Sequence, residues 1–163
     1  MAGAVPKILS REALAGALAG LPGRTVFTNG CFDLLHVGHV RYLQAARACG
    51  ERLVVGLNSD ASVAGLKGPA RPLVAEDERA EVLAALGCVD FVTVFSEATA
   101  ESLLALLRPH VYAKGGDYTP DSLPEAPVVR AYGGEIAIIP FVPGRSTTNL
   151  VARIRSLPPT ERI

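Results

Sequence analysis

Short apolar runs alternate with helix-patterned segments along the chain, and this alternation constrains the fold more than any other feature of the sequence. The runs are rich in Val, Leu, Ile and Phe without polar alternation, which is typical of strands buried on both faces of a parallel sheet. We expect such strands at 24–28, 53–57, 91–95, 111–114 and 136–139. The pattern predicts a doubly wound, Rossmann-like α/β fold of about five parallel strands with helices on both faces.

The segments between these runs carry the apolar spacing and the stop signals of helices. We expect helices at 10–21, 40–49, 76–86, 98–107 and 147–156, with Ser10 as the first N-cap and with Gly50 and Gly87 as stops. The stretch 64–72 and the Pro-rich stretch 119–127 are expected to be loops. The length of 163 residues suits one domain over 1–163, in which the helix at 10–21 precedes a core at 24–156.

The overall charge and the cysteine content exclude several classes of protein. Lys plus Arg and Asp plus Glu both number 16, and this balance argues against a nucleic-acid binder, which needs a basic surface. The three cysteines show no CxxC spacing, which argues against a disulfide framework or a zinc site. No apolar run is long enough for a membrane span, and no secretory signal is apparent. We therefore expect a cytoplasmic protein without a membrane or nucleic-acid partner.

The first strand runs directly into the segment 29–39 (NGCFDLLHVGH), and a helix follows. A strand, a turn and a helix N-terminus together form an anion site, because free backbone N–H groups and the helix dipole point at one spot. His36 and His39 are three residues apart and share one face of a helical turn, and Gly38 leaves room for a phosphate. Two imidazoles can stabilise the charge that develops in phosphoryl or nucleotidyl transfer. The alternative, that each histidine only caps the helix or lies at the surface, is disfavoured by this context.

Three further segments have the composition of a phosphate or nucleotide site. The segment 114–118 (KGGDY) follows a strand and so lies at the carboxyl edge of the sheet, although a plain turn is an alternative. Ser146, Thr147 and Thr148 precede the last helix, where hydroxyls and backbone N–H groups can bind phosphates. Lys67 lies between Gly65 and Gly68 and could reach a phosphate, the alternative being a solvated lysine.

Together these segments resemble a known enzyme superfamily. GCFDLLHVGH is similar to the HxGH signature of the HIGH-type nucleotidyltransferases, which include the cytidylyltransferases. Further segments occur in the same order in one subfamily, the D-glycero-D-manno-heptose 1-phosphate adenylyltransferases: 57–60, 66–68, 71–72, 111–118 and 146–149. The similarity covers 24–155. Phe141 stands where the cytidylyltransferases carry an arginine, which favours a heptose acceptor, and Arg145 could supply the missing charge.

The resemblance implies transfer of AMP from ATP to the heptose phosphate, with Mg²⁺ held by the triphosphate and not by side chains. Catalysis is assigned to His36, His39 and Lys67. The expected nucleotide contacts are Thr28, Asn29, Gly30, Cys31, Phe32, Gly38, Lys114, Gly116, Asp117, Ser146, Thr147 and Thr148. The expected acceptor contacts are Asp33, Asn58, Asp60, Arg71 and Arg145.

Two other functions stay open at this point. One is a cytidylyltransferase for a polyol or amino-alcohol phosphate such as glycerol 3-phosphate, and the other is a non-catalytic nucleotide sensor. The intact HxGH motif, Lys67 and the Ser-Thr-Thr turn disfavour the sensor. The expected partners are ATP, a sugar 1-phosphate and a second copy of the chain, with the heptose kinase as a separate protein. The sequence leaves open which anomer of the heptose phosphate is used.

Overall fold

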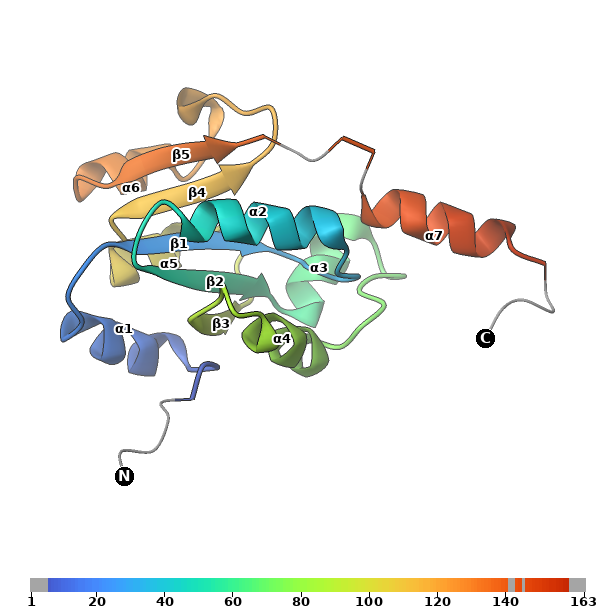
Figure 1. The fold of residues 1–163 in the computed structure, drawn as a ribbon, viewed down its shortest axis with the longest axis horizontal. Coiled ribbons are helices and arrows are strands. Elements are labelled where there is room, and N and C mark those ends of the chain that lie inside the picture. The colour runs from blue at the N-terminus through green and yellow to red at the C-terminus, as the bar shows by residue number, and fades with distance from the viewer. Residues whose placement is uncertain (1–5, 141–142, 145, 159–163) are drawn as a thin grey trace.

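The computed structural model describes residues 6–140, 143–144 and 146–158. It contains a sheet of five strands in the order β3-β2-β1-β4-β5 (Figure 1). The strands are β1 (Thr25–Gly30), β2 (Arg52–Asn58), β3 (Phe91–Phe95), β4 (Val111–Gly115) and β5 (Glu135–Ile139). Every neighbouring pair is parallel, which confirms the predicted doubly wound sheet.

The order of the strands places a topological switch point between β1 and β4. The chain winds outward from β1 to β3 and then crosses back, so that β4 lies on the other side of β1. The ladder between these two strands joins Val26 to Val111 and Phe27 to Tyr112, although β1 continues to Gly30 and β4 to Gly115. The two strands therefore part towards their carboxyl ends, where doubly wound folds bind their ligands.

The helices are α1 (Arg11–Ala19), α2 (Val37–Arg47), α3 (Asp60–Lys67), α4 (Glu76–Ala85), α5 (Glu101–Leu107), α6 (Ala126–Ala131) and α7 (Thr147–Ser156), with a 3₁₀ turn, η1, at Pro120–Ser122. Helices α2 and α4 cover one face of the sheet, where Leu43 and Leu83 pack with Val26. On the other face, α1, α5 and α6 pack around Phe27 and Tyr112. The continuous apolar strands are thus buried from both sides, as the sequence pattern predicted.

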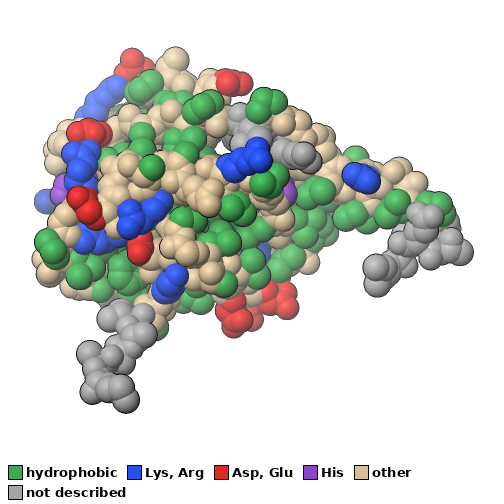
Figure 2. Space-filling view, in the orientation of Figure 1, with side chains coloured by type: hydrophobic (Ala, Val, Ile, Leu, Met, Phe, Trp, Pro, Cys, Tyr) green, Lys and Arg blue, Asp and Glu red, His purple; other side chains and the backbone are tan. Residues whose placement is uncertain are grey.

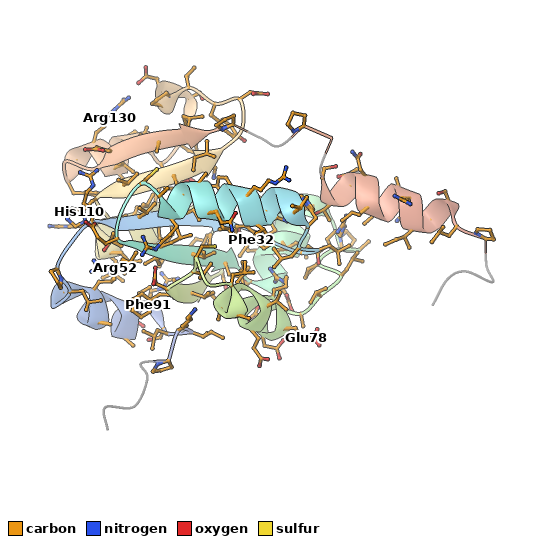
Figure 3. The ribbon with its side chains drawn as sticks, in the orientation of Figure 1. Phe32, Arg52, Glu78, Phe91, His110 and Arg130 are labelled. Carbon is orange, nitrogen blue, oxygen red and sulfur yellow. The ribbon has the colours of Figure 1, made fainter. Side chains whose placement is uncertain are left out.

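Helix α7 differs from the others because it stands away from the sheet (Figures 1 and 2). None of its residues is buried, and the apolar side chains of Leu150 and Ile154 are exposed. The opposite end of the molecule is marked by Arg52 and His110, which lie at the amino ends of β2 and β4 (Figure 3). Within the described ranges, no helix is both long and apolar enough to cross a lipid bilayer.

Two predicted loops are wrong in part. The stretch 64–72 begins inside α3, which is capped by Ser59, whose Oγ accepts a hydrogen bond from the Ser62 backbone N–H at 3.2 Å. The stretch 119–127 contains η1 and the start of α6. The proline content misled the second prediction, because Pro127 lies in the first turn of α6, where the missing N–H costs no hydrogen bond.

Candidate active site

The connection between β1 and α2 is held by a reciprocal cap made of two histidines. Helix α2 begins at Val37, three residues before the predicted start, so Gly38 and His39 lie in its first turn. The Nδ1 atom of His36 accepts a hydrogen bond from the Gly38 backbone N–H at 3.1 Å, and Nδ1 of His39 accepts from the His36 backbone N–H at 3.4 Å. The two rings stack with their centroids 3.9 Å apart. The pair therefore caps the helix, as the disfavoured alternative proposed.

This cap determines which ring nitrogen carries a proton. Because Nδ1 of each histidine accepts a hydrogen bond, the neutral ring carries its proton on Nε2. Burial lowers the pKa of His39 to about 4, and the positive charges of His36 and Lys67 act in the same direction. At neutral pH, His39 is therefore an uncharged hydrogen-bond donor. Capping and ligand binding are compatible, because they use opposite sides of the ring.

The turn before the cap contains a residue in an unusual backbone conformation. Phe32 has a φ of 45°, in the left-handed region that bulky residues rarely adopt. Its buried ring packs edge-on against His39, with 5.4 Å between the centroids. A Cβ on Gly30 would lie 2.9 Å from the same ring, so this position has no room for a side chain. This strained residue lies beside the histidine pair. Strained backbone conformations commonly occur at functional sites.

A cavity of about 390 Å³ lies at the carboxyl ends of β1 and β4 and brings half of the predicted site residues together. Its lining combines the turn after β1, the start of α2, the end of α3, the end of β4 and the start of α7. Ten predicted residues line it: Asn29, Gly30, Cys31, Phe32, Asp33, Gly38, His39, Lys67, Lys114 and Thr147. Gly115, Tyr118 and Tyr42 complete the lining. Two lysines and the N-terminus of α2 make this cavity suited to an anion.

The other predicted contacts lie outside this lining. His36 stacks behind His39, and Ser146 caps α7 by accepting from the Asn149 backbone N–H at 3.1 Å. The backbone N–H of Gly116 donates to the carbonyl of Ile139 at 3.0 Å. The remaining residues absent from the lining are Thr28, Asp117, Thr148, Asn58, Asp60 and Arg71. Phe141 and Arg145 fall outside the described residues.

Tyr42 is a lining residue that the sequence reading missed. Its hydroxyl donates to the carbonyl of Ala113 at 3.2 Å and shares a hydrogen bond of 2.6 Å with the hydroxyl of Thr28. It thus bridges β1 and β4 where their own ladder has ended, and burial raises its pKa to about 12. The spacing of three residues after His39 places it on the same face of α2 and could have identified it.

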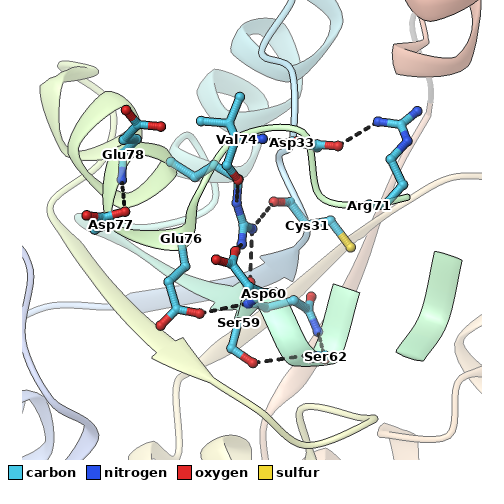
Figure 4. A network of polar contacts seen from close by, with 12 residues as sticks. Cys31, Asp33, Ser59, Asp60, Ser62, Arg71, Val74, Glu76, Asp77 and Glu78 are labelled. Carbon is cyan, nitrogen blue, oxygen red and sulfur yellow. Dashed lines mark hydrogen bonds and ion pairs between the residues drawn. The ribbon is translucent and has the colours of Figure 1, made fainter. Parts of the chain in front are cut away.

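Asp33 and Arg71, both predicted to contact the acceptor, bind each other. Their ion pair measures 2.5 Å, and the other carboxylate oxygen accepts from the backbone N–H groups of Leu73 and Val74 at 2.8 and 3.0 Å (Figure 4). Burial alone would raise the pKa of Asp33, but these hydrogen bonds outweigh it and lower the pKa. The pair ties the segment after α3 to the turn after β1. Contact with an acceptor stays a prediction for both residues.

Arg79 joins the turn after β1 to the end of β2. The side chain is 2% exposed and donates to the carbonyls of Cys31, Asn58 and Val74 at 2.6, 2.9 and 2.8 Å. It also pairs with Asp60 at 2.6 Å, so the predicted acceptor contact at Asp60 is engaged within the chain. A buried guanidinium with four partners within the chain has a structural role.

A second cavity of about 360 Å³ adjoins the first. The two share five lining residues: Asn29, Gly30, Cys31, Lys114 and Tyr118. Beyond this common wall, the second cavity is lined by Asn58, Leu66, Ala98, Thr99, Leu123, Pro124 and Glu125. The Lys114 ammonium lies at the junction, 3.4 Å from Asn29 Oδ1 and 4.0 Å from Glu125 Oε1. Burial lowers the pKa of Lys114, and the Glu125 carboxylate partly opposes this effect.

Comparison with known proteins places this geometry in a family. The model of the cytidylyltransferase-like family matches residues 27–151. The bifunctional protein HldE of Pelobacter propionicus is 54% identical over 151 residues, which are 91% of this chain and 31% of the relative. HldE of Geotalea uraniireducens is 60% identical over 133 residues, which are 82% of this chain and 27% of the relative. The chain thus spans about a third of the length of these relatives.

Two solved structures share the fold. A lipopolysaccharide core biosynthesis protein from Thermoplasma volcanium has a TM-score of 0.60 and 26% identity, covering 74% of this chain and 98% of its own. Pantothenate synthetase from Thermus thermophilus has a TM-score of 0.61 and 18% identity, covering 96% of this chain and 70% of its own. The second likeness concerns the fold alone.

Proposed function

The chain belongs to the cytidylyltransferase-like family of nucleotidyltransferases, and we propose that it transfers AMP from ATP to D-glycero-D-manno-heptose 1-phosphate. The observation that carries this proposal is the convergence of His39, Lys67, Lys114 and Thr147 on one cavity from separate elements. The ordered motifs of the heptose subfamily and the similarity to HldE support the choice of acceptor. Similarity to a lipopolysaccharide core biosynthesis protein is consistent with a sugar substrate.

The reaction needs no side-chain nucleophile. An oxygen of the sugar phosphate attacks the α-phosphorus of ATP, a new P–O bond forms, and the bond to the β-phosphate breaks with release of pyrophosphate. Catalysis then consists of positioning and of stabilising charge in the transition state. Neutral His39 would donate its Nε2–H to an oxygen of the reacting phosphates, and the Lys67 ammonium would stabilise the leaving pyrophosphate.

His36 is assigned here as a positioning residue. It lies outside the cavity lining, and it fixes the tautomer and orientation of His39 through the reciprocal cap and the stacked ring.

Thr147 is the first residue of α7 and lines the cavity, and its hydroxyl donates to the carbonyl of Leu34 at 3.3 Å. This contact holds the Thr147 backbone N–H where it can donate a hydrogen bond to a phosphate.

We propose that Mg²⁺ enters with the triphosphate of the nucleotide substrate. The described residues contain no group of three or more His, Cys, Asp or Glu side chains that could hold a metal ion. The carboxylate of Asp33, which is nearest in the chain to the histidine motif, is engaged by Arg71 and two backbone N–H groups. Triphosphate oxygens are ligands that Mg²⁺ prefers.

A pyrophosphate-release assay tests the proposal directly. ATP, CTP and GTP are each combined with both anomers of heptose 1-phosphate and with glycerol 3-phosphate. We expect release only with ATP and one heptose 1-phosphate anomer. Because the chain belongs to the cytidylyltransferase-like family, a cytidylyltransferase for a polyol phosphate is the second candidate. Preference for CTP and glycerol 3-phosphate would establish that function instead.

The assembly is also a proposal. Leu150 and Ile154 are exposed and lie four residues apart, on one face of α7, and no residue of this helix is buried. This uncovered apolar face supports a homodimer, because a second copy of the chain could cover it. Sedimentation equilibrium of the wild type and of Ile154→Glu tests it. A dimer that dissociates in the variant is expected, and a wild-type monomer would contradict it.

A further inference from the structure

Glu125 is a buried acid that the proposed mechanism leaves without a task. It precedes α6, it lines the second cavity, and its residue is 3% exposed. Among the described residues, its Oε2 atom has no hydrogen-bond partner. Its Oε1 atom has Lys114 Nζ at 4.0 Å, which is too long for a hydrogen bond.

The neighbouring groups are occupied with other partners. The Tyr112 hydroxyl donates its single proton to Asn29 Oδ1 at 2.8 Å, and Lys114 Nζ is closer to the same oxygen than to Glu125. Burial raises the pKa of Tyr112, and the charge of Glu125 and the closeness of its carboxylate to the phenol raise it further, so the phenol stays protonated. A buried carboxylate oxygen without a donor is unfavourable, and such groups commonly have a functional role.

The two cavities differ in the chemistry that they offer a ligand. The first presents Lys67 and neutral His39, which bind phosphate oxygens. The second contains the carboxylate of Glu125 in its lining, together with Asn58 and Thr99. A carboxylate repels phosphate but accepts hydrogen bonds from hydroxyl groups. The wall shared by the cavities contains Lys114, so a ligand in the second cavity can place an anionic end at the junction.

We propose that Glu125 is a specificity-determining residue that accepts hydrogen bonds from the hydroxyl groups of a polyhydroxylated phosphate ester bound in the second cavity. The phosphate of this acceptor lies towards Lys114 and the first cavity, and its carbon chain with the hydroxyls lies towards Glu125. The inference rests on the proposed function, because it places the acceptor opposite the nucleotide. It adds the side chain that distinguishes a polyol chain from a shorter or deoxygenated one.

A role for Glu125 as a mere counter-ion of Lys114 makes a different prediction. Removing a counter-ion would change the affinity for every anionic ligand that depends on Lys114, which lines both cavities. Removing a hydroxyl acceptor would weaken the acceptor alone. It would also leave the fold about as stable as before, because Glu125 Oε2 makes no hydrogen bond that the fold would lose and Glu125 Oε1 lies 4.0 Å from Lys114 Nζ.

The test compares Glu125→Gln with Asp121→Asn in steady-state kinetics and thermal unfolding. Asp121 is the matched control because it lies in the same β4–α6 connection and pairs with Arg130 at the surface. In Glu125→Gln, we expect the KM of the sugar phosphate to rise roughly 10- to 100-fold, as for loss of a hydrogen bond to a charged group. The KM of the nucleotide and the melting temperature should not be impaired. Asp121→Asn should match the wild type.

Deoxygenated acceptors sharpen the test. Removing the hydroxyl that binds Glu125 should weaken the acceptor in the wild type and cause no further loss in Glu125→Gln. Equal KM values in variant and wild type would overturn the proposal. So would equal losses for nucleotide and acceptor, or a lower melting temperature without a specific effect on the acceptor.

Failure of the proposed function is recognised separately. If the wild type turns over no sugar phosphate, the heptose assignment fails, and calorimetric titration of the same sugar phosphates then decides the role of Glu125. Weaker binding in Glu125→Gln than in the wild type would support it. No binding of any sugar phosphate to the wild type would overturn it.

Discussion

The two adjoining cavities share a wall at the ends of β1 and β4 but present opposite chemistry beyond it. On one side lie His39, Lys67 and the start of α2, and on the other lies the carboxylate of Glu125. The parting of β1 and β4 creates the space, and the connections after each strand supply the charges. The difference teaches that one topological switch point can hold two adjoining cavities of different charge, which we propose to be a phosphate-binding half and a hydroxyl-binding half. Substitutions that affect one half and not the other test this separation.

The largest expected effect breaks both halves at once. Arg79→Met leaves Asp60 and the carbonyls of Cys31, Asn58 and Val74 without their guanidinium partner, and Cys31 lines both cavities. The free energy of unfolding should fall by about 3–5 kcal/mol, because several hydrogen bonds to a charged group are lost, each contributing about 1.5–3 kcal/mol. Urea denaturation measures it, with Arg41→Met on the exposed face of α2 as the control. A fall in the free energy of unfolding of less than about 1 kcal/mol would contradict this role, because that is the contribution of an ordinary surface ion pair.

The next effect should be confined to the phosphate-binding half. His39→Ala removes the neutral donor, and kcat/KM should fall roughly 100- to 1000-fold, as when one oxyanion donor is removed. Pyrophosphate release measures it, and Gln44→Ala, an exposed position on the same helix, should leave turnover unchanged. Full turnover in His39→Ala would remove this residue from the mechanism.

A smaller effect is expected for Lys67, which lines the first cavity but not the second. Lys67→Met keeps the apolar stem and removes the charge, so kcat/KM should fall roughly 10- to 100-fold, with the acceptor KM unchanged. Lys67→Arg should restore part of the activity because it restores the charge. If the acceptor KM rose as much as kcat/KM fell, Lys67 would contribute to acceptor binding, and the proposed separation of the two halves would be wrong.

The smallest effect concerns pH. The pKa of His39, about 4, lies below its ordinary value of 6.5, so the unfolded chain binds the proton more tightly than the folded chain. This residue's contribution to stability is complete above pH 6.5 and is lost as the pH falls from 6.5 to 4. NMR titration of the three histidines measures the pKa, and bound nucleotide should raise it because phosphate stabilises the imidazolium. A pKa near 6.5 in the free protein would contradict the geometry of the cap.

The sequence predicted the sheet well because its signals are local. The apolar run 91–95 coincides with β3, and the segment 147–156 coincides with α7, which Ser146 caps. The HxGH motif was likewise recognisable because strand, turn and helix follow one another along the chain. Half of the predicted site residues line one cavity for this reason, and their contacts with phosphate stay a prediction.

The remaining parts depend on contacts between distant segments. Nothing near Asp33 in the sequence indicates that Arg71 would neutralise it across 38 positions. Glu125 lay in a stretch interpreted as a Pro-rich loop, and its burial follows from the packing of α6 on the sheet. The role of Arg79 was missed because its four partners come from three other segments.

The central claim is that nucleotide and acceptor occupy separate, adjoining cavities, and one binding experiment tests it most directly. A non-hydrolysable ATP analogue and heptose 1-phosphate are each titrated by calorimetry into the wild type, His39→Ala and Glu125→Gln. The account predicts that His39→Ala weakens the nucleotide and spares the sugar phosphate, whereas Glu125→Gln does the reverse. Weakening of the same ligand by both variants would contradict it.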